Sequence, residues 1–184
     1  MKIPPQAKLV FKGIIFDVYQ WEQEMYDGSY ETFEMLKRAN TLQVIATQGE
    51  NVLIAYEEQP TKGPSYTLLG GRQNEGEEPI DAAKREMKEE AGLVSDDWEL
   101  YKHFDPYNKM DWTVYTYIAR NCKKNAEPSL DAGEKIEVKT VNFDEFVRIA
   151  TEEHFWGVNL TVELLKMQME PRKLEEFKKK LFGK

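Results

Sequence analysis

Three glutamates gather on one face of a short predicted helix near the middle of the chain. Glu86 and Glu90 lie one helical turn apart, so their carboxylates project side by side, and Glu89 lies a little further round. Like charges at this spacing destabilise a helix by roughly 0.2–0.5 kcal/mol, and the C-terminal end of a helix favours cations. A hard divalent cation would remove the conflict, because it prefers carboxylate oxygens as ligands. The residues alone leave two interpretations open, a metal site or a solvated acidic face.

The helix that carries these glutamates is clearly marked. Pro79 suits a first helical turn, where its missing N–H is not needed, and Asp81 suits the positive end of the helix dipole. Gly92 stands where a left-handed C-cap is expected. An apolar stripe at helical spacing predicts that one face packs into a core; it comprises Ile80, Ala83, Met87 and Ala91.

Residues 70–93 resemble the Nudix box, G-x5-E-x7-R-E-U-x-E-E-x-G-U, in which U is a bulky apolar residue. Every position of the pattern is filled, by Gly71, Glu77, Arg85, Glu86, Met87, Glu89, Glu90, Gly92 and Leu93. The resemblance implies hydrolysis of a nucleoside diphosphate linked to another moiety, with Mg²⁺ (or Mn²⁺) as cofactor. It therefore favours the metal site over the solvated face.

The resemblance also implies a role for each residue of the box. Glu86 and Glu90 would be the principal metal ligands, and Glu89 would assist directly or by bridging. The main-chain carbonyl of Gly70 would bind metal as well, since glycine lets the main chain come close. Glu77 and Arg85 would hold the loop against the helix as an ion pair. The structural positions of the box would be Gly71, Glu77, Arg85 and Gly92.

The general base of the reaction is not fixed by the box. In several Nudix subfamilies it lies on a late loop, where this chain offers Asp131, Glu134 and Glu137. Glu134, in the segment LDAGEKIEV before a predicted strand, is the candidate that we favour, with Glu89 as its rival. The alternative for Glu134 is an ordinary exposed glutamate.

The composition narrows the functional classes. The chain has 184 residues, 41% of them hydrophobic, and a formal net charge of −8, which suits one globular domain and argues against a nucleic-acid partner. Bound cations would have to offset the repulsion between this acidic protein and a phosphate substrate. We find no signal peptide and no apolar run of about 18 residues, and Cys122 is the only cysteine. We therefore expect a cytoplasmic protein without a membrane partner.

The order of predicted elements is strands, the box helix, more strands and late helices. Strands are predicted at residues 42–46, 52–56, 66–69, 98–104, 112–120 and 136–143, with a loop at 59–65. Asp144 is expected to cap a helix running to about residue 152, and Asn159 a second helix that Pro171 ends. The order fits an α/β (α+β) fold, an α/β/α sandwich around a mixed sheet, which is the fold that the Nudix resemblance implies.

Three parts of the chain are expected. Residues 1–38 would form an antiparallel β-ribbon around the turn at Asp27-Gly28, and a ribbon of this size must pack on the main domain, on a second subunit or on both. Residues 39–170 would form the hydrolase domain. Residues 171–184 would form an amphipathic helix, either docked or frayed.

The ribbon, the box and the late loop together resemble the ADP-ribose pyrophosphatase branch of the family. This resemblance implies ADP-ribose or a related nucleoside-diphosphate sugar as substrate, with AMP and ribose 5-phosphate as products from ADP-ribose, and a homodimer formed through the ribbon. Further substrate contacts would come from Tyr19, Trp21, Phe33, Arg38 and Pro106. The aromatic residues could stack on a base and Arg38 could pair with a phosphate. The alternatives are core positions for the aromatic residues and a plain surface position for Arg38.

The chain also departs from that branch. Thr67-Leu68-Leu69-Gly70-Gly71 stands where Glu-Leu-Pro-Ala-Gly is common, and residues 57–60 lack an arginine that the branch commonly has. Nucleoside triphosphates, dinucleoside polyphosphates and other capped diphosphates therefore stay open as substrates. A non-catalytic nucleotide-binding module is a more distant alternative.

Overall fold

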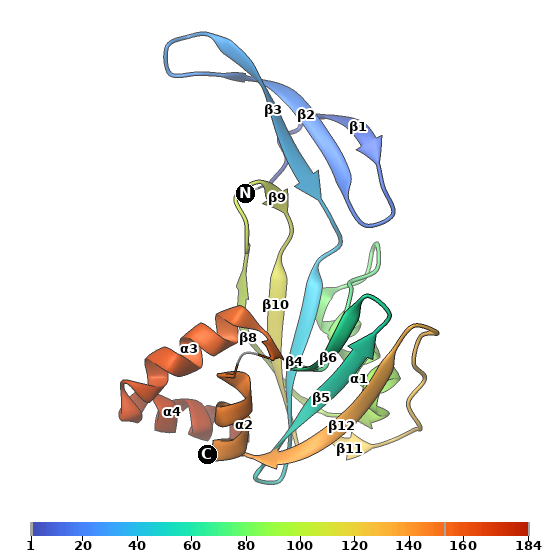
Figure 1. Cartoon of the computed structure of the whole chain (residues 1–184), viewed down its shortest axis with the longest axis vertical. Coiled ribbons are helices and arrows are strands. Elements are labelled where there is room, and N and C mark those ends of the chain that lie inside the picture. Colours follow the sequence, from blue (N-terminus) through green and yellow to red (C-terminus); the bar gives the residue numbers. More distant parts are fainter. Residues whose placement is uncertain (1, 153, 184) are drawn as a thin grey trace.

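A computed structural model describes residues 2–152 and 154–183 and shows a body with an extended ribbon above it (Figure 1). The elements, in chain order, are β1 (Lys8–Lys12), β2 (Asp17–Glu24), β3 (Tyr30–Lys37), β4 (Thr41–Gln48), β5 (Asn51–Gln59), β6 (Lys62–Thr67), α1 (Pro79–Ala91), β7 (Leu93–Val94), β8 (Asp97–Phe104), β9 (Met110–Asp111), β10 (Val114–Arg120), β11 (Lys123–Lys124), β12 (Lys135–Asn142), α2 (Phe143–Ala150), β13 (Phe155–Trp156), α3 (Val158–Gln168) and α4 (Pro171–Phe182).

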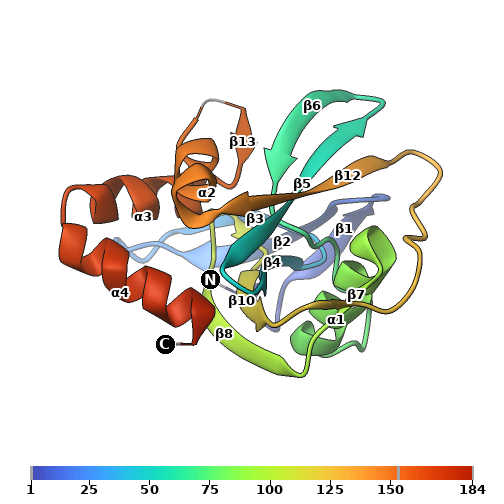
Figure 2. The same ribbon diagram turned by 90° about the horizontal axis from the view of Figure 1, so that it is seen from below.

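The body is built on a seven-stranded mixed sheet. Its strand order is β13-β6-β5-β4-β10-β8, and β12 also pairs with β5. The β4–β10 and β6–β13 pairs are parallel, and the other pairs are antiparallel. Helix α1 lies on one side of the sheet, and α2, α3 and α4 lie on the other (Figure 2). The predicted α/β/α sandwich around a mixed sheet is therefore confirmed.

Two apolar clusters fill the spaces between the sheet and the helices. Successive strand residues point to opposite faces, so on β4 Val44 packs in the cluster with α1 whereas Ile45 packs in the cluster with α2, α3 and α4. Helix α4 belongs to the second cluster, because Phe177 and Leu181 are buried in it. The C-terminal helix is thus docked. No helix among the described residues has both the length and the apolar character needed to span a bilayer.

The N-terminal ribbon is antiparallel, as predicted, and it contains three strands of its own. The predicted turn lies between β2 and β3, where Gly28 has a φ of 83°. Strand β9, from the loop after β8, pairs in parallel with the end of β3, at Leu36 and Met110. This pairing gives the ribbon a second connection to the body beside the chain that runs from β3 into β4 (Figure 1).

Three local predictions were wrong. The loop expected at 59–65 is mostly strand β6, since Pro64 lies where the pairing with β5 is irregular and proline is tolerated. The cap of α2 is Asn142, whose Oδ1 accepts a 2.9 Å hydrogen bond from the Glu145 N–H, so Asp144 lies within the first turn. Helix α3 begins at Val158 after Gly157, and Asn159 is likewise inside the helix.

Candidate active site

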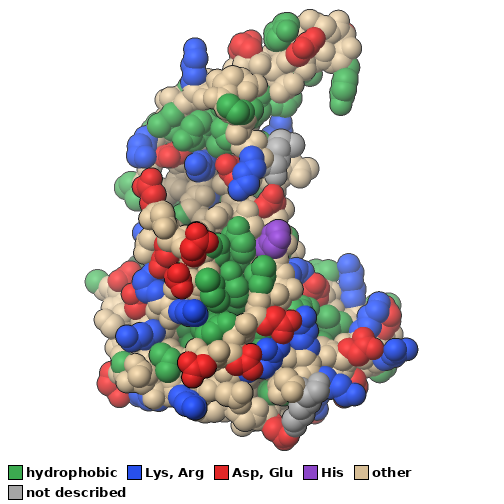
Figure 3. Space-filling model, turned by 180° about the vertical axis from the view of Figure 1, so that it is seen from behind, with side chains coloured by type: hydrophobic (Ala, Val, Ile, Leu, Met, Phe, Trp, Pro, Cys, Tyr) green, Lys and Arg blue, Asp and Glu red, His purple; other side chains and the backbone are tan. Residues whose placement is uncertain are grey.

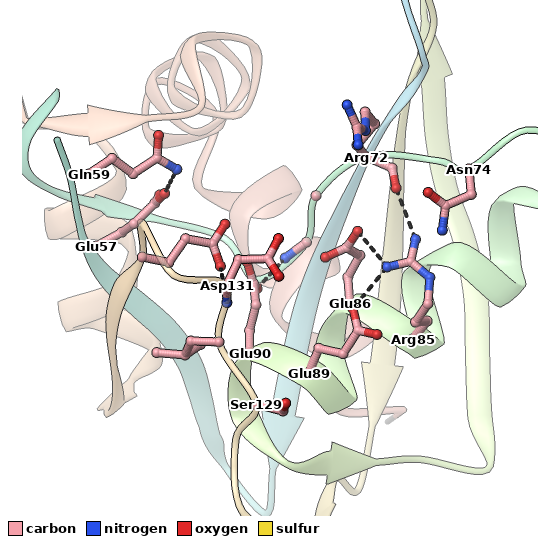
Figure 4. A pocket seen from close by; sticks show the side chains of 14 residues that line it. Glu57, Gln59, Arg72, Asn74, Arg85, Glu86, Glu89, Glu90, Ser129 and Asp131 are labelled. Carbon is pink, nitrogen blue, oxygen red and sulfur yellow. Dashed lines mark hydrogen bonds and ion pairs between the residues drawn. The ribbon is translucent and has the colours of Figure 1, made fainter. Parts of the chain in front are cut away.

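A cleft of about 500 Å³ opens beside α1, between the loop that precedes this helix and the loop that precedes β12 (Figure 4). Carboxylates from three parts of the chain line it: Glu57, Glu86, Glu89, Glu90, Asp131 and Glu134. The box glutamates come from α1, Glu57 comes from β5, and the other two come from the late loop. The fold thus gathers acidic groups that are far apart in the sequence around one cleft.

Glu90 is the most buried of the acidic groups on α1, with 9% of its surface exposed. Its Oε2 accepts a 2.7 Å hydrogen bond from the Gly70 N–H. Burial raises the pKa of Glu90 to about 9, the Gly70 N–H opposes this rise, and the carboxylates of Glu86, Glu134 and Glu57 add to it. A cation in the cleft would offset this desolvation and repulsion, so Glu90 fits the role of a metal ligand.

Glu86 is held by the loop that opens the box. Burial raises the pKa of Glu86, while hydrogen bonds from Arg85 and from the main chain of Arg72 favour its charged form. A Cβ atom on Gly71 would lie 2.6 Å from the Glu86 carboxylate. Only glycine therefore leaves room at position 71 for the carboxylate to stand where it does.

Arg85 makes five hydrogen bonds, three to the loop that precedes α1 and two to glutamates of α1 itself. Its Nε donates to Glu77 Oε1 and its Nη2 to Glu77 Oε2, both at 3.0 Å. Its Nη1 donates to Glu86 Oε1 at 2.8 Å and to Glu89 Oε2 at 2.9 Å, and Nη2 also donates to the Arg72 carbonyl at 2.9 Å. The structure therefore places Glu77 and Arg85 in the contact expected of them, and it adds two box glutamates to the network.

The glycine pair before the box turns the chain from the sheet into the loop. The Val44 N–H donates to the Leu69 carbonyl at 2.7 Å, and the Leu42 N–H donates to the Gly71 carbonyl at 2.8 Å. Between them, Gly70 has a φ of +134°, and a Cβ atom there would lie 2.1 Å from the Leu42 carbonyl oxygen. The carbonyls on both sides of Gly70 are therefore engaged by β4.

The late loop brings two of its three candidate bases to the cleft. Asp131 and Glu134 line the cleft and close a turn, in which the Glu134 N–H donates to the Asp131 carbonyl at 3.0 Å. Glu137 is exposed on β12, 3.7 Å from the Lys139 amine, and does not line the cleft. Glu89, the rival within the box, is half exposed and bonded to Arg85.

The carboxylates that line the cleft fit a hard divalent cation, which prefers oxygen ligands. One of them, Glu90, is buried, and its burial disfavours the charged form unless a cation is near. Within residues 2–152 and 154–183, no three such side chains already converge on one point. Glu86 and Glu89 turn toward Arg85, and Glu90 turns toward Gly70.

A second cavity, of about 800 Å³, lies between the body and the ribbon. Its charged lining is more basic than acidic, with Lys2, Lys12, Lys37, Arg38 and Arg72 against Asp17, Glu75 and Asp111. Tyr19 lines it too. Arg72 and Asn74 also line the acidic cleft, so the two cavities adjoin.

Three predicted substrate contacts lie elsewhere. Trp21 is buried in the ribbon, where its ring packs 5.9 Å from that of Phe33, as the core alternative expects. Pro106 lies in the loop between β8 and β9, and neither it nor Trp21 nor Phe33 lines either cavity.

Sequence reasoning missed Glu57, Arg72 and Asn74 as cleft residues. Glu57 is buried at the end of β5, where it accepts hydrogen bonds from Gln59 and, at 3.2 Å, from the Lys62 amine. A signal was present, because a glutamate directly after the apolar run of a buried strand requires a partner or a function.

The sequence matches a known protein family over most of its length. Residues 36–160, more than half of the sequence, match the family described as NUDIX domain. The chain belongs to this family and is a Nudix hydrolase.

Its relatives point to one branch of that family. The chain is 21% identical over 164 residues to ADP-ribose pyrophosphatase of Bacillus subtilis (strain 168), which covers 87% of this chain and 89% of that protein. It is 22% identical over 169 residues to methanol dehydrogenase activator of Bacillus methanolicus, covering 90% and 91%. A crystal structure of an ADP compounds hydrolase has the same fold, with a TM-score of 0.72 and 14% identity over 91% of this chain and 94% of that one. Within the Nudix hydrolases, the chain is most like the ADP-ribose pyrophosphatase branch.

Proposed function

We propose that the protein hydrolyses the pyrophosphate bond of a nucleoside diphosphate linked to another moiety, and that ADP-ribose is its substrate. The products would be AMP and ribose 5-phosphate. The observation that carries this proposal is the adjoining of an acidic cleft and a basic cavity, which share Arg72 and Asn74. A linked diphosphate needs a place for cations at the reacting phosphorus, which the acidic cleft would provide. It also needs a larger space for the nucleoside, which the basic cavity would provide.

Mg²⁺, or Mn²⁺ in its place, would be held by Glu86 and Glu90, with Glu89 assisting. The bound cation would neutralise charge on the diphosphate and lower the pKa of a water. The Gly70 carbonyl is a further candidate ligand, since its neighbouring carbonyls are engaged by β4. Arg85 orients Glu86 and Glu89 through its hydrogen bonds and ties the loop to α1.

Glu134 is our candidate for the base that takes the proton from water. It lines the same cleft as the three box glutamates and stands on a loop whose turn is fixed by the hydrogen bond to Asp131. Glu89 is the rival, but its carboxylate is engaged by Arg85. A Glu134→Gln variant should bind substrate normally and lose turnover about 100-fold or more, whereas near-normal turnover in this variant would favour Glu89 as the base.

We also propose that the ribbon forms a homodimer. Large apolar side chains are exposed on it (Figure 3), namely Leu9, Val10, Phe11, Ile14, Ile15, Phe16, Tyr26 and Tyr30. An exposed set of this kind is typical of an interaction surface. Mass measurement in solution should give twice the chain mass, and Phe11→Glu should shift it to the monomer. We further propose a cytoplasmic location, which the single, buried Cys122 supports.

A hydrolysis panel with product identification tests the proposed reaction. The panel contains ADP-ribose, other nucleoside-diphosphate sugars, dinucleoside polyphosphates and nucleoside triphosphates, each with Mg²⁺ and with EDTA. We expect Mg²⁺-dependent release of AMP and ribose 5-phosphate from ADP-ribose. Equal or faster turnover of triphosphates would transfer the proposal to that substrate class, and binding without any turnover would support the non-catalytic module instead.

A further inference from the structure

Arg72 occupies the junction of the two cavities. It lines both the acidic cleft and the ribbon cavity, and Asn74 is the other residue that does so among those described. Its guanidinium extends away from the carboxylates of Glu86 and Glu90 (Figure 4). A molecule that fills both cavities must pass this side chain.

The guanidinium of Arg72 has no carboxylate partner within the described part of the chain, although acidic residues are plentiful in this protein. Arg38 and Arg72 line the same cavity, and burial, followed by the positive charge of Arg72, lowers the pKa of Arg38. Arg38 itself lies with its guanidinium 4.6 Å from the centre of the Trp112 ring and 5.7 Å from that of Phe16. Within the described residues, neither guanidinium has an ion-pair partner, and two neighbouring guanidinium groups of this kind are a favourable place for an anion.

The main chain of Arg72 is held firmly, so the position of its side chain is defined. Its carbonyl accepts from Arg85, and Arg72 pairs with Thr41 in an isolated bridge. The next residue, Gln73, donates from its N–H to the Asn40 carbonyl at 2.9 Å, and its Oε1 accepts from the Asn40 amide at 2.8 Å. These contacts fix the loop of Arg72 to the segment that follows Arg38.

We infer that Arg72 is a further phosphate-binding residue, which acts with Arg38, already a candidate from the sequence, to bind one phosphate group of the substrate on the ribbon side of the acidic cleft. The diphosphate would then lie with one phosphate at the metal-binding glutamates and the other at the two arginines. Arg72 would be a specificity-determining residue, which favours linked diphosphates over compounds with a single phosphate. The inference takes from the proposed function only the diphosphate nature of the ligand.

The test measures binding without turnover. Inorganic pyrophosphate is titrated into the metal-free protein in EDTA by calorimetry, for the natural chain, Arg72→Leu, Arg38→Leu and the double variant. We expect each single variant to weaken binding about tenfold, since an arginine–phosphate contact is a charge-assisted hydrogen bond. Both arginines contact the same anion, so their effects should not be independent. The fold-loss of pyrophosphate affinity in the double variant should be smaller than the product of the fold-losses in the two single variants.

Arg172→Leu is the matched control, since Arg172 is an exposed arginine on α4 that pairs only with Glu176 among the described residues. It should bind pyrophosphate like the natural chain. Arg72→Lys keeps the charge and loses the planar fork, so it should recover only part of the affinity. In hydrolysis assays, Arg72→Leu should raise KM about tenfold and change kcat by less than about threefold.

Unchanged pyrophosphate affinity in Arg72→Leu, or an equal loss in Arg172→Leu, would overturn the inference. Fully additive losses in the double variant would also contradict it. These outcomes are independent of the hydrolysis panel, because the binding measurement involves no reaction. Conversely, a chain that hydrolyses ADP-ribose while Arg72→Leu keeps its KM and its pyrophosphate affinity would retain the proposed function and lose only this inference.

Discussion

The Gly70 N–H donates a 2.7 Å hydrogen bond to Oε2 of Glu90, and this contact joins the end of the sheet to the last turn of α1. Glu90 is almost fully buried, and the carboxylates around it disfavour its charge. One main-chain N–H is a small compensation for a buried carboxylate. Glu90 is therefore placed where a cation would have a large effect on the whole site.

Glu90→Gln keeps the size of the side chain and an oxygen that can accept from Gly70, but it removes the charge. We expect hydrolysis to fall about 100-fold or more, since a metal ligand is lost while the fold is kept. Addition of Mg²⁺ should raise the melting temperature of the natural chain, because a ligand that binds only the folded state stabilises it. Addition of Mg²⁺ should not change the melting temperature of Glu90→Gln. Full activity in this variant would contradict the assignment.

The stability of the metal-free protein should depend on pH through Glu90. Its pKa is raised from an ordinary value of 4.5 to about 9, so between these values the folded chain holds a proton that the unfolded chain releases. The free energy of unfolding therefore falls as pH rises through this window. Melting curves in EDTA at increasing pH should show this fall, and Glu90→Gln should show less of it. Parallel curves for the two proteins would refute the prediction.

The glycines that open the box should differ in their sensitivity to alanine. Gly70 has a positive φ, and Gly70→Ala would place a Cβ 2.1 Å from the Leu42 carbonyl oxygen. We therefore expect the free energy of unfolding to fall by at least about 2 kcal/mol. Gly71→Ala meets the movable Glu86 carboxylate at 2.6 Å, so activity should fall more than stability. The control is Gly63→Ala, where a Cβ has nothing within 4 Å. Denaturant unfolding and initial rates measure both effects.

Phe177→Ala tests whether α4 is part of the core. Phe177 is 3% exposed and packs between Tyr101 and Phe143, with ring centres 5.5 and 6.3 Å away. Removal of a buried phenylalanine costs about 3–5 kcal/mol, which urea unfolding should detect. Lys179→Ala on the exposed side of the same helix is the control and should change stability little. A frayed helix would tolerate both substitutions equally.

The helix of the box was the most predictable element, because its signals are local. Pro79 opens it and Gly92 closes it with a φ of 65°, as expected from their types. Spacing alone placed the glutamates of the box side by side, since helical geometry converts sequence intervals directly into neighbouring positions. The resemblance to the Nudix box was needed to favour a metal site over a solvated acidic face. The prediction of a loop at 59–65 was wrong because the deciding contact is not local. Its proline and glycine are turn signals, and only the pairing of β6 with β5 shows that they lie in a strand.

The rest of the site depends on tertiary structure. Glu57 reaches the cleft because β5 runs beside β12, at positions separated by almost eighty residues in the pair of Glu57 with Ile136. Arg72 lines a cavity between the ribbon and the body, and a cavity between two distant segments cannot be recognised from the sequence. The caps of α2 and α3 were each misplaced by two residues, because a periodic apolar pattern fixes the phase of a helix better than its first residue.

The ribbon contributes residues to the basic cavity and none to the acidic cleft, and this division has an evolutionary consequence. The ribbon is attached to the body through the β3–β4 connection and the β3–β9 pairing, whereas the glutamates stand on α1. Residues such as Lys12, Tyr19 and Lys37 can therefore vary without disturbing the carboxylates. A gene of this kind could acquire a new nucleotide preference through its first forty codons or so, while the hydrolytic apparatus encoded further on stays untouched.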